Sequence, residues 1–336
     1  MNYEQIRFSR PDGLVRKKPF QKVTIRQAVT VFLIQILLFF TVESLAQIYL
    51  GNGGLAITEA IVLAVAVIPV WILHADPREV FLVRRPNRWA TGGALVFLIG
   101  AYSLSVIANS LMMMLFPKEF AQIYESTEAA SSTFPVDLVV VCLMPAVCEE
   151  ALHRGLIQSA VRERVHSLVG QSIIMGVFFA FFHVYPIRYP AMFVMGAALS
   201  YVYGLTGNLF YSSLMHFSCN LFATLLGYLG QGALTAAAVV PLPGGIRLTV
   251  SPEEVSAAMS AGSFGLILLI YGIPAVFFLY LGEYLIRRGT DAVRPYFVPR
   301  DRRRQKSVLW NRIYSPIIAI AAVGVLFLVI GIAFGI

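Results

Sequence analysis

Charged residues are scarce in this sequence. Only 13% of its 336 residues are Asp, Glu, Lys or Arg, whereas 58% are hydrophobic. A soluble domain carries roughly twice that charged fraction, so the composition excludes an ordinary soluble protein and indicates a polytopic membrane protein. Lys and Arg outnumber Asp and Glu by 26 to 18. We assign this excess to loops that face an anionic membrane surface, and we expect no nucleic-acid partner.

Cysteines are also few, and their spacing suggests no pairing. Cys142, Cys148 and Cys219 all lie in apolar stretches, which argues against a disulfide framework or a zinc knuckle and predicts small buried packing residues. A signal-peptide cleavage pattern is missing after the basic residues 1–23. We therefore expect a basic cytoplasmic tail followed by a retained first helix.

Long apolar runs dominate the rest of the chain. Each is long enough, or nearly so, for a helix that crosses a bilayer. They predict an all-α fold, a polytopic membrane helix bundle with about nine transmembrane helices. The expected spans are 24–49, 54–74, 91–116, 135–160, 167–185, 190–205, 208–228, 262–286 and 312–336.

The distribution of basic residues predicts the orientation of these spans. With the amino terminus inside, the loops rich in Arg face the cytoplasm, in agreement with the positive-inside rule. Those loops contain Arg78, Arg84, Arg85 and Arg88, then Arg162 and Arg164, then the segment 287–306. The outside loops 51–54, 117–134 and 229–261 are poor in Lys and Arg, and Arg188 is the exception. We expect a multi-pass protein of the cell membrane with a cytoplasmic amino terminus.

One short stretch concentrates ionisable side chains. Glu149, Glu150, His153 and Arg154 directly follow the apolar run 139–148. Charge at that depth in a membrane helix is costly and usually functional. On a helix, Glu150 and Arg154 can pair, while Glu149 points about 100° away and stays free for chemistry. The alternative is that these charges close a membrane helix at its aqueous end.

Two further polar clusters lie in apolar helices. His183 follows Phe179 by four residues, and Asn220 follows His216 by four, so each pair shares a helix face. Each cluster, taken singly, is also compatible with a packing histidine or an interhelical amide. Because buried polar groups in lipid must find partners, the clusters together favour one polar site.

Antiparallel pairing predicts that two of these side chains meet. Glu149 and His183 each lie 17 residues from the turn near His166, about 25 Å along each helix. A carboxylate and an imidazole across one gap can hold and deprotonate a water. A stripe of small residues in span six would let helices approach closely there, although ordinary packing explains it equally well. The stripe consists of Gly196, Ser200 and Gly204.

Three motifs occur in order on these apolar helices. They are Glu149-Glu150-x-x-x-Arg154, Phe179-x-x-x-His183 and His216-x-x-x-Asn220. In this combination the sequence resembles the CPBP family of intramembrane proteases, the CAAX prenyl endopeptidases and their bacterial relatives, also known as Abi or bacteriocin-immunity proteins. The resemblance covers roughly residues 134–225. It implies hydrolysis of a peptide or membrane-protein substrate, with Glu149 as the base that activates water and His183 also holding that water.

The remaining motif residues receive their roles from the same resemblance. His216 and Asn220 would stabilise the oxyanion of the tetrahedral intermediate. Glu150 and Arg154 would fix the first carboxylate and the helix geometry. Preorganised donors at a developing oxyanion commonly give the largest catalytic effect. His153 lies outside the motif and is either a local partner of Glu149 or a polar edge residue.

A zinc mechanism is the alternative to a metal-free one. Glu149, His183 and His216 form a His-His-Glu set, a ligand type found in catalytic zinc sites. The sequence lacks a His-Glu-x-x-His helix and shows no carboxylates placed to orient zinc-binding histidines. We therefore prefer a mechanism without a cofactor and keep zinc as the alternative.

Two non-proteolytic functions compete with this interpretation. A membrane scaffold, immunity or assembly factor would keep its function when only Glu149 loses its charge. A transporter often shows inverted repeats, and the sequence has none. The predicted organisation places a basic tail first, then amino-terminal helices, the catalytic core, an outside loop with a short surface helix over 252–260, and carboxy-terminal helices with a basic loop. Their bounds are 1–23, 24–133, 134–228, 229–261 and 262–336.

Overall fold

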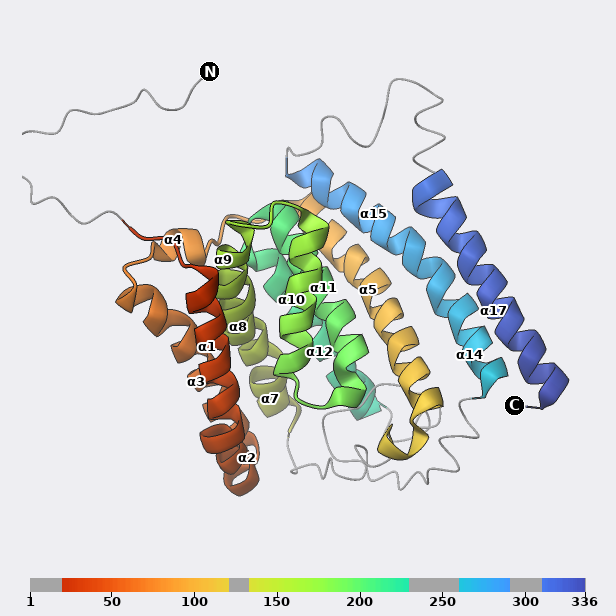
Figure 1. Ribbon diagram of the computed structural model, residues 1–336, viewed down its shortest axis with the longest axis horizontal. Coiled ribbons are helices and arrows are strands. Elements are labelled where there is room, and N and C mark those ends of the chain that lie inside the picture. The colour runs from red at the N-terminus through yellow and green to blue at the C-terminus, as the bar shows by residue number, and fades with distance from the viewer. Residues whose placement is uncertain (1–19, 121–132, 230–259, 291–309, 336) are drawn as a thin grey trace, which may run out of the picture.

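The computed structural model describes residues 20–120, 133–229, 260–290 and 310–335 (Figure 1). The regular elements in these ranges are helices, and the ranges contain no strand. The predicted all-α class is therefore confirmed. The surface helix expected over 252–260 lies almost wholly outside the described residues, as does most of the predicted tail.

Each predicted span coincides with a helical segment in the described ranges. Several segments contain short π-helical stretches, labelled η. The long segments are α1–η1–α2 (Ile25–Leu38, Phe39–Glu43, Ser44–Leu50), α3 (Asn52–Ile72), α5 (Arg88–Leu115), α7–η2–α8–η3–α9 (Phe134–Asp137, Leu138–Leu143, Met144–Glu150, Ala151–Ile157, Gln158–Arg162), α10 (Leu168–Phe182), α11 (Tyr189–Thr206), α12 (Leu209–Leu229), α14–η5–α15 (Ala261–Ile267, Leu268–Gly272, Ile273–Gly289) and η6–α17 (Trp310–Tyr314, Ser315–Phe334). The short α4 (Pro77–Val80) and the 3₁₀ turn η4 (Pro186–Arg188) lie in connections.

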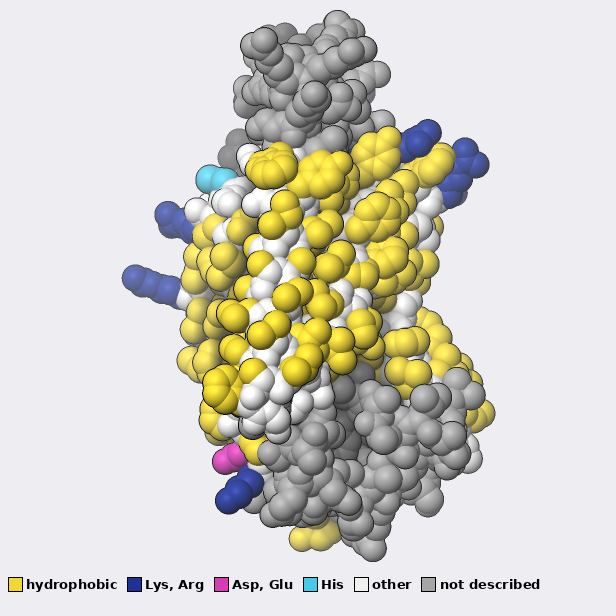
Figure 2. Space-filling view, turned by 90° about the vertical axis from the view of Figure 1, so that its right-hand side faces the viewer, with side chains coloured by type: hydrophobic (Ala, Val, Ile, Leu, Met, Phe, Trp, Pro, Cys, Tyr) yellow, Lys and Arg dark blue, Asp and Glu magenta, His cyan; other side chains and the backbone are white. Residues whose placement is uncertain are grey.

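Many of these helices have the length and composition of membrane spans. In the described ranges, six helices are long and apolar enough to cross a bilayer, and α10 is a shorter apolar helix. Figure 2 shows hydrophobic side chains covering one face of the bundle, with Lys and Arg side chains at its margins. The protein is a multi-pass membrane protein.

Basic side chains gather at one end of the bundle. This is the end where α1 and α5 begin and where α3, α9 and α15 finish (Figure 1). Its described residues include Lys22, Arg26, Arg78, Arg84, Arg85, Arg88, Arg162, Arg164, Arg287, Arg288 and Arg312. The opposite end carries Lys118 and Arg188 in the parts of the chain that are described. An asymmetry of this kind is what the positive-inside rule uses to orient a membrane protein.

Two hydrophobic clusters hold the helices around the motif segment. The first joins α1, α3, the α8–η3 segment and α10, and Val62, Leu152 and Met175 are fully buried in it. The second joins α5, α11, α12 and α15, and includes Leu199 and Met215. The α7–α9 segment packs against α3 and α12, so its polar residues lie inside the bundle.

The predicted small-residue stripe on α11 is a close-packing surface. A Cβ atom at Gly196 would overlap the Phe179 side chain of α10, and one at Gly204 would lie 2.8 Å from Leu168. Ser200 Oγ instead donates a 2.9 Å hydrogen bond to a side-chain oxygen of Gln158. Small side chains here let α10 and α11 approach closely, and this approach brings Phe179 toward the motif segment.

Candidate active site

The carboxylate pair lies at the junction of two helix types. Glu149 and Glu150 end α8, and the π-helical turn Ala151–Ile157 follows them. All residues from Glu149 to Val161 are buried, and the helix continues to Arg162. The charges therefore do not close a helix at an aqueous end, and that alternative is wrong. Short π-helical turns within α-helices, such as Ala151–Ile157, are frequent at functional sites.

Glu150 is paired as its spacing predicts. Arg154 Nη1 donates to Glu150 Oε1 at 2.6 Å, and the two side chains are 0% and 1% exposed. Arg154 Nη2 also donates to the carbonyl oxygen of Gly196 at 3.0 Å. The guanidinium carbon lies 4.8 Å from the centre of the Phe179 ring, a cation–π geometry. Three elements therefore hold one guanidinium in place.

His216 connects both carboxylates to α12. Its Nδ1 lies 2.9 Å from Glu150 Oε1, and its Nε2 lies 4.0 Å from Glu149 Oε2. Glu150 thus accepts from both Arg154 and His216. Glu149 Oε2 is buried and has no hydrogen-bond partner among the described residues. Glu150 is therefore bonded through Oε1, while its Oε2 has no partner among the described residues, and Glu149 is the carboxylate without a bonded Oε1 neighbour of this kind.

His216 also lines a cavity of about 230 Å³. His183, His216 and Asn220 line it, together with apolar side chains such as Met195. Asn220 Nδ2 donates to the carbonyl oxygen of Val141 at 3.1 Å, which leaves the second amide hydrogen available. The predicted donors of α12 therefore face one space together with the histidine that follows α10.

The approach of Glu149 and His183 across one water-filled gap stays a prediction. No hydrogen bond joins them within the described part of the chain; His183 Nδ1 lies 2.8 Å from the carbonyl oxygen of Phe179. His153 instead contacts α10, with its ring 5.3 Å from that of Phe179 and 5.0 Å from that of Phe182. The hairpin arithmetic assumed regular α-helices, whereas a π-helical turn follows Glu150.

His153 is a core residue and not a polar edge residue. It is 0% exposed, and its Nδ1 lies 2.9 Å from the backbone carbonyl oxygen of Glu149. It is therefore a local partner of Glu149 through the backbone, and its ring fills the space between η3 and α10.

Three charged residues were missed in the sequence. Arg188, treated only as an exception to the charge rule, lines the same cavity as His183. Glu59 of α3 is 3% exposed and near enough to Glu149 for the two charges to interact. Glu43 of η1 is fully buried and accepts from Gln35 Nε2 at 2.9 Å. The signal was present, since both acids interrupt apolar spans.

Glu149, His183 and His216 are the ligands that the zinc alternative names. No group of three or more His, Cys, Asp or Glu side chains could hold a metal ion in the ranges that the structure describes. One expectation needs correction: Glu150 is a carboxylate partner of His216, the kind of partner that commonly orients a zinc-binding histidine.

A comparison with models of protein families finds a match. Residues 131–222 match the model described as Type II CAAX prenyl endopeptidase Rce1-like. This segment, about a quarter of the chain, is similar to the CAAX proteases. It extends from just before α7 into α12 and contains every motif residue from Glu149 to Asn220, so the resemblance to the CPBP family is confirmed over that segment. Comparisons with curated proteins and with solved structures find no match.

Proposed function

We propose that the protein is an intramembrane endopeptidase that hydrolyses peptide bonds with a water activated by Glu149 and His183. One observation carries the proposal. Arg154 and His216 both bind Glu150, whereas Glu149 Oε2 is buried without a partner among the described atoms. The site therefore keeps one carboxylate available beside a histidine and a cavity, as a general base requires.

The geometry around Glu149 suits a bound water. Glu149 Oε2 and His216 Nε2 are 4.0 Å apart, too far for a direct hydrogen bond. One water can bond to both, because two hydrogen bonds of about 2.8 Å that meet near 90° span this distance. A His183 ring that donates Nδ1–H to the carbonyl oxygen of Phe179 presents its Nε2 as an acceptor. That acceptor would orient a water proton from the cavity side.

His216 and Asn220 are the proposed oxyanion donors. With Nδ1–H donating to Glu150, His216 has a second N–H only as an imidazolium. The spare amide hydrogen of Asn220 faces the same cavity. Donors aimed at a developing negative charge lower the barrier in a site with little water.

The proposed reaction needs no other proton carrier. Glu149 takes a proton from the water as its oxygen attacks the peptide carbonyl carbon, and the carbonyl oxygen becomes the oxyanion bound by His216 and Asn220. Collapse of this intermediate breaks the C–N bond. Glu149 then returns the proton to the leaving amine, so atoms and charges balance.

The substrate class and location follow from the position of the site. The cavity lies within the helix bundle, so the substrate is a peptide or membrane protein that reaches the site at membrane depth. The positive-inside rule, applied to the basic end of the bundle, supports a cytoplasmic amino terminus and a location in the cell membrane. No nucleic-acid partner is expected.

Comparative proteomics tests this function directly. Membrane peptides from cells with the native protein are compared with those from cells with Glu149→Gln. Cleavage products present only with the native protein support the peptidase. A phenotype that Glu149→Gln preserves in full would instead show a membrane scaffold, immunity or assembly factor.

A further inference from the structure

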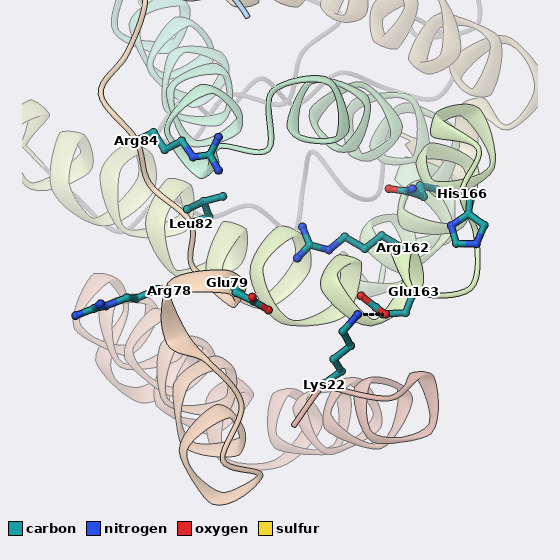
Figure 3. A pocket seen from close by; sticks show the side chains of 9 residues that line it. Lys22, Arg78, Glu79, Leu82, Arg84, Arg162, Glu163 and His166 are labelled. Atoms are coloured by element: carbon teal, nitrogen blue, oxygen red, sulfur yellow. Dashed lines mark hydrogen bonds and ion pairs between the residues drawn. The ribbon is translucent and has the colours of Figure 1, made fainter. Parts of the chain in front are cut away.

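A second cavity lies at the basic end of the bundle. Its volume is about 690 Å³, and its walls come from the segment around α4, the turn between α9 and α10, and the residue Lys22 before α1 (Figure 3). The residues that line it are different from those around His216. The proposed peptidase mechanism therefore does not use this space.

The lining of this basic-end cavity carries excess positive charge. Four cations and two acids contribute, which leaves a formal charge of +2. Lys22 Nζ pairs with Glu163 at 2.7 Å. The cations Arg78, Arg84 and Arg162 form no ion pair within the described residues, and Glu79 is the acid that remains. Such a cluster lowers its own repulsion by binding an anion.

Two of the arginines are positioned by the fold. Both backbone groups of Arg84 bond the side chain of Asn208, which is 2% exposed, and each of these two bonds is 3.1 Å long. Leu209 N also donates to the carbonyl oxygen of Leu82 at 2.9 Å. Arg162 ends the buried helix α9. Figure 3 shows the two guanidinium groups extending into the cavity from different segments.

This arrangement fits a phosphate group. The planar guanidinium presents paired N–H donors that match two phosphate oxygens. Basic pockets between membrane helices at the charged end of a bundle suit phospholipid headgroups, since the phosphates of the bilayer lie at that level. We propose that the cavity binds the phosphate of an anionic phospholipid headgroup through Arg84 and Arg162, and that Glu79 limits its affinity.

Lipid binding to the full chain tests the proposal. Purified protein in a neutral detergent is titrated with short-chain phosphatidylglycerol, and bound lipid is counted by native mass spectrometry. The double variant Arg84→Gln, Arg162→Gln should bind about tenfold or more weakly, because two charge-assisted sites are lost. Arg85→Gln with Arg164→Gln is the matched control: it removes the same charge from the same end without touching the cavity lining. The control should retain the parent affinity.

Further variants separate a specific site from general attraction. Arg84→Lys with Arg162→Lys keeps the charge but removes the planar donors, and should also weaken binding. Glu79→Gln should strengthen it and serves as a folded variant if the arginine changes reduce stability. Equal losses in the cavity and control double variants would overturn the proposal, because total charge would then explain binding. If inorganic phosphate binds tightly and the lipid fails to displace it, the proposal that the bound phosphate belongs to a phospholipid is wrong.

Discussion

Glu150 Oε1 and His216 Nδ1 lie 2.9 Å apart, although 66 residues separate them in the chain. The same oxygen accepts from Arg154 at 2.6 Å. A carboxylate with two cationic or polar donors is a poor base, because both donors stabilise its charged form. This contact is the reason why the proposed mechanism gives Glu150 a positioning role and Glu149 the role of the base.

Glu149→Gln should remove activity without removing the fold. The amide keeps the shape of the side chain but accepts no proton, so turnover should fall by at least ~100-fold. Peptidase assays on purified protein measure the change. Glu119→Gln, at an exposed position, is the control and should retain full turnover. Proteolysis that persists in pure Glu149→Gln would reject Glu149 as the base.

Arg154→Ala should destabilise the protein as well as inactivate it. Breaking a buried ion pair costs about 3–5 kcal/mol, and Arg154 is 0% exposed and bonded to both Glu150 and Gly196. Thermal unfolding in detergent should show a lower midpoint than in the parent. Arg164→Ala, which removes an exposed charge from the same segment, should leave the midpoint unchanged. An equally stable Arg154→Ala would mean that the pair contributes no net stability.

Asn220→Ala should reduce turnover while substrate binding changes little. Loss of one oxyanion donor costs about 10²–10³-fold in turnover, and the charge that it stabilises develops only in the transition state. Steady-state kinetics should therefore show a lower kcat with a similar KM. A rise in KM at unchanged kcat would instead assign Asn220 to substrate binding.

His216→Ala separates the glutamate mechanism from the zinc alternative. Without a metal, turnover should fall by a similar factor, and chelators should leave the parent enzyme active. Elemental analysis of active protein is the measurement. A content of about one zinc per chain in the parent that is lost in His216→Ala would indicate zinc catalysis. If chelation also inactivates the parent and added zinc restores its activity, zinc catalysis by Glu149, His183 and His216 is established.

Gly196→Ala should disturb the site through the side chain of Phe179. A Cβ at this position overlaps Phe179, whose ring packs on Arg154. Overpacking of this kind costs about 1–3 kcal/mol, so both thermal stability and activity should fall. Gly92→Ala is the matched control, because a Cβ there meets nothing within 4 Å. Its helix should be equally or slightly more stable, since Ala has the higher helix propensity.

The sequence determined much of what depends on one helix at a time. Apolar runs predicted the spans, and the i,i+4 spacing predicted the pairing of Glu150 with Arg154, because helix geometry alone makes those side chains neighbours. The spacing of His216 and Asn220 likewise placed them on one face, and both line one cavity. The motif order was enough to indicate the family.

Only the tertiary structure decided how the helices face one another. The bond from His216 to Glu150, the isolation of Glu149 Oε2 and the position of Arg188 on the cavity depend on the rotation and depth of neighbouring helices. The π-helical turn after Glu150 is a further feature that the arithmetic of a regular hairpin did not include. Close packing of α10 on α11 at Gly196 then set the depth of Phe179. The rotation and depth of each helix result from many small contacts between distant segments, and local residue spacing does not encode those contacts.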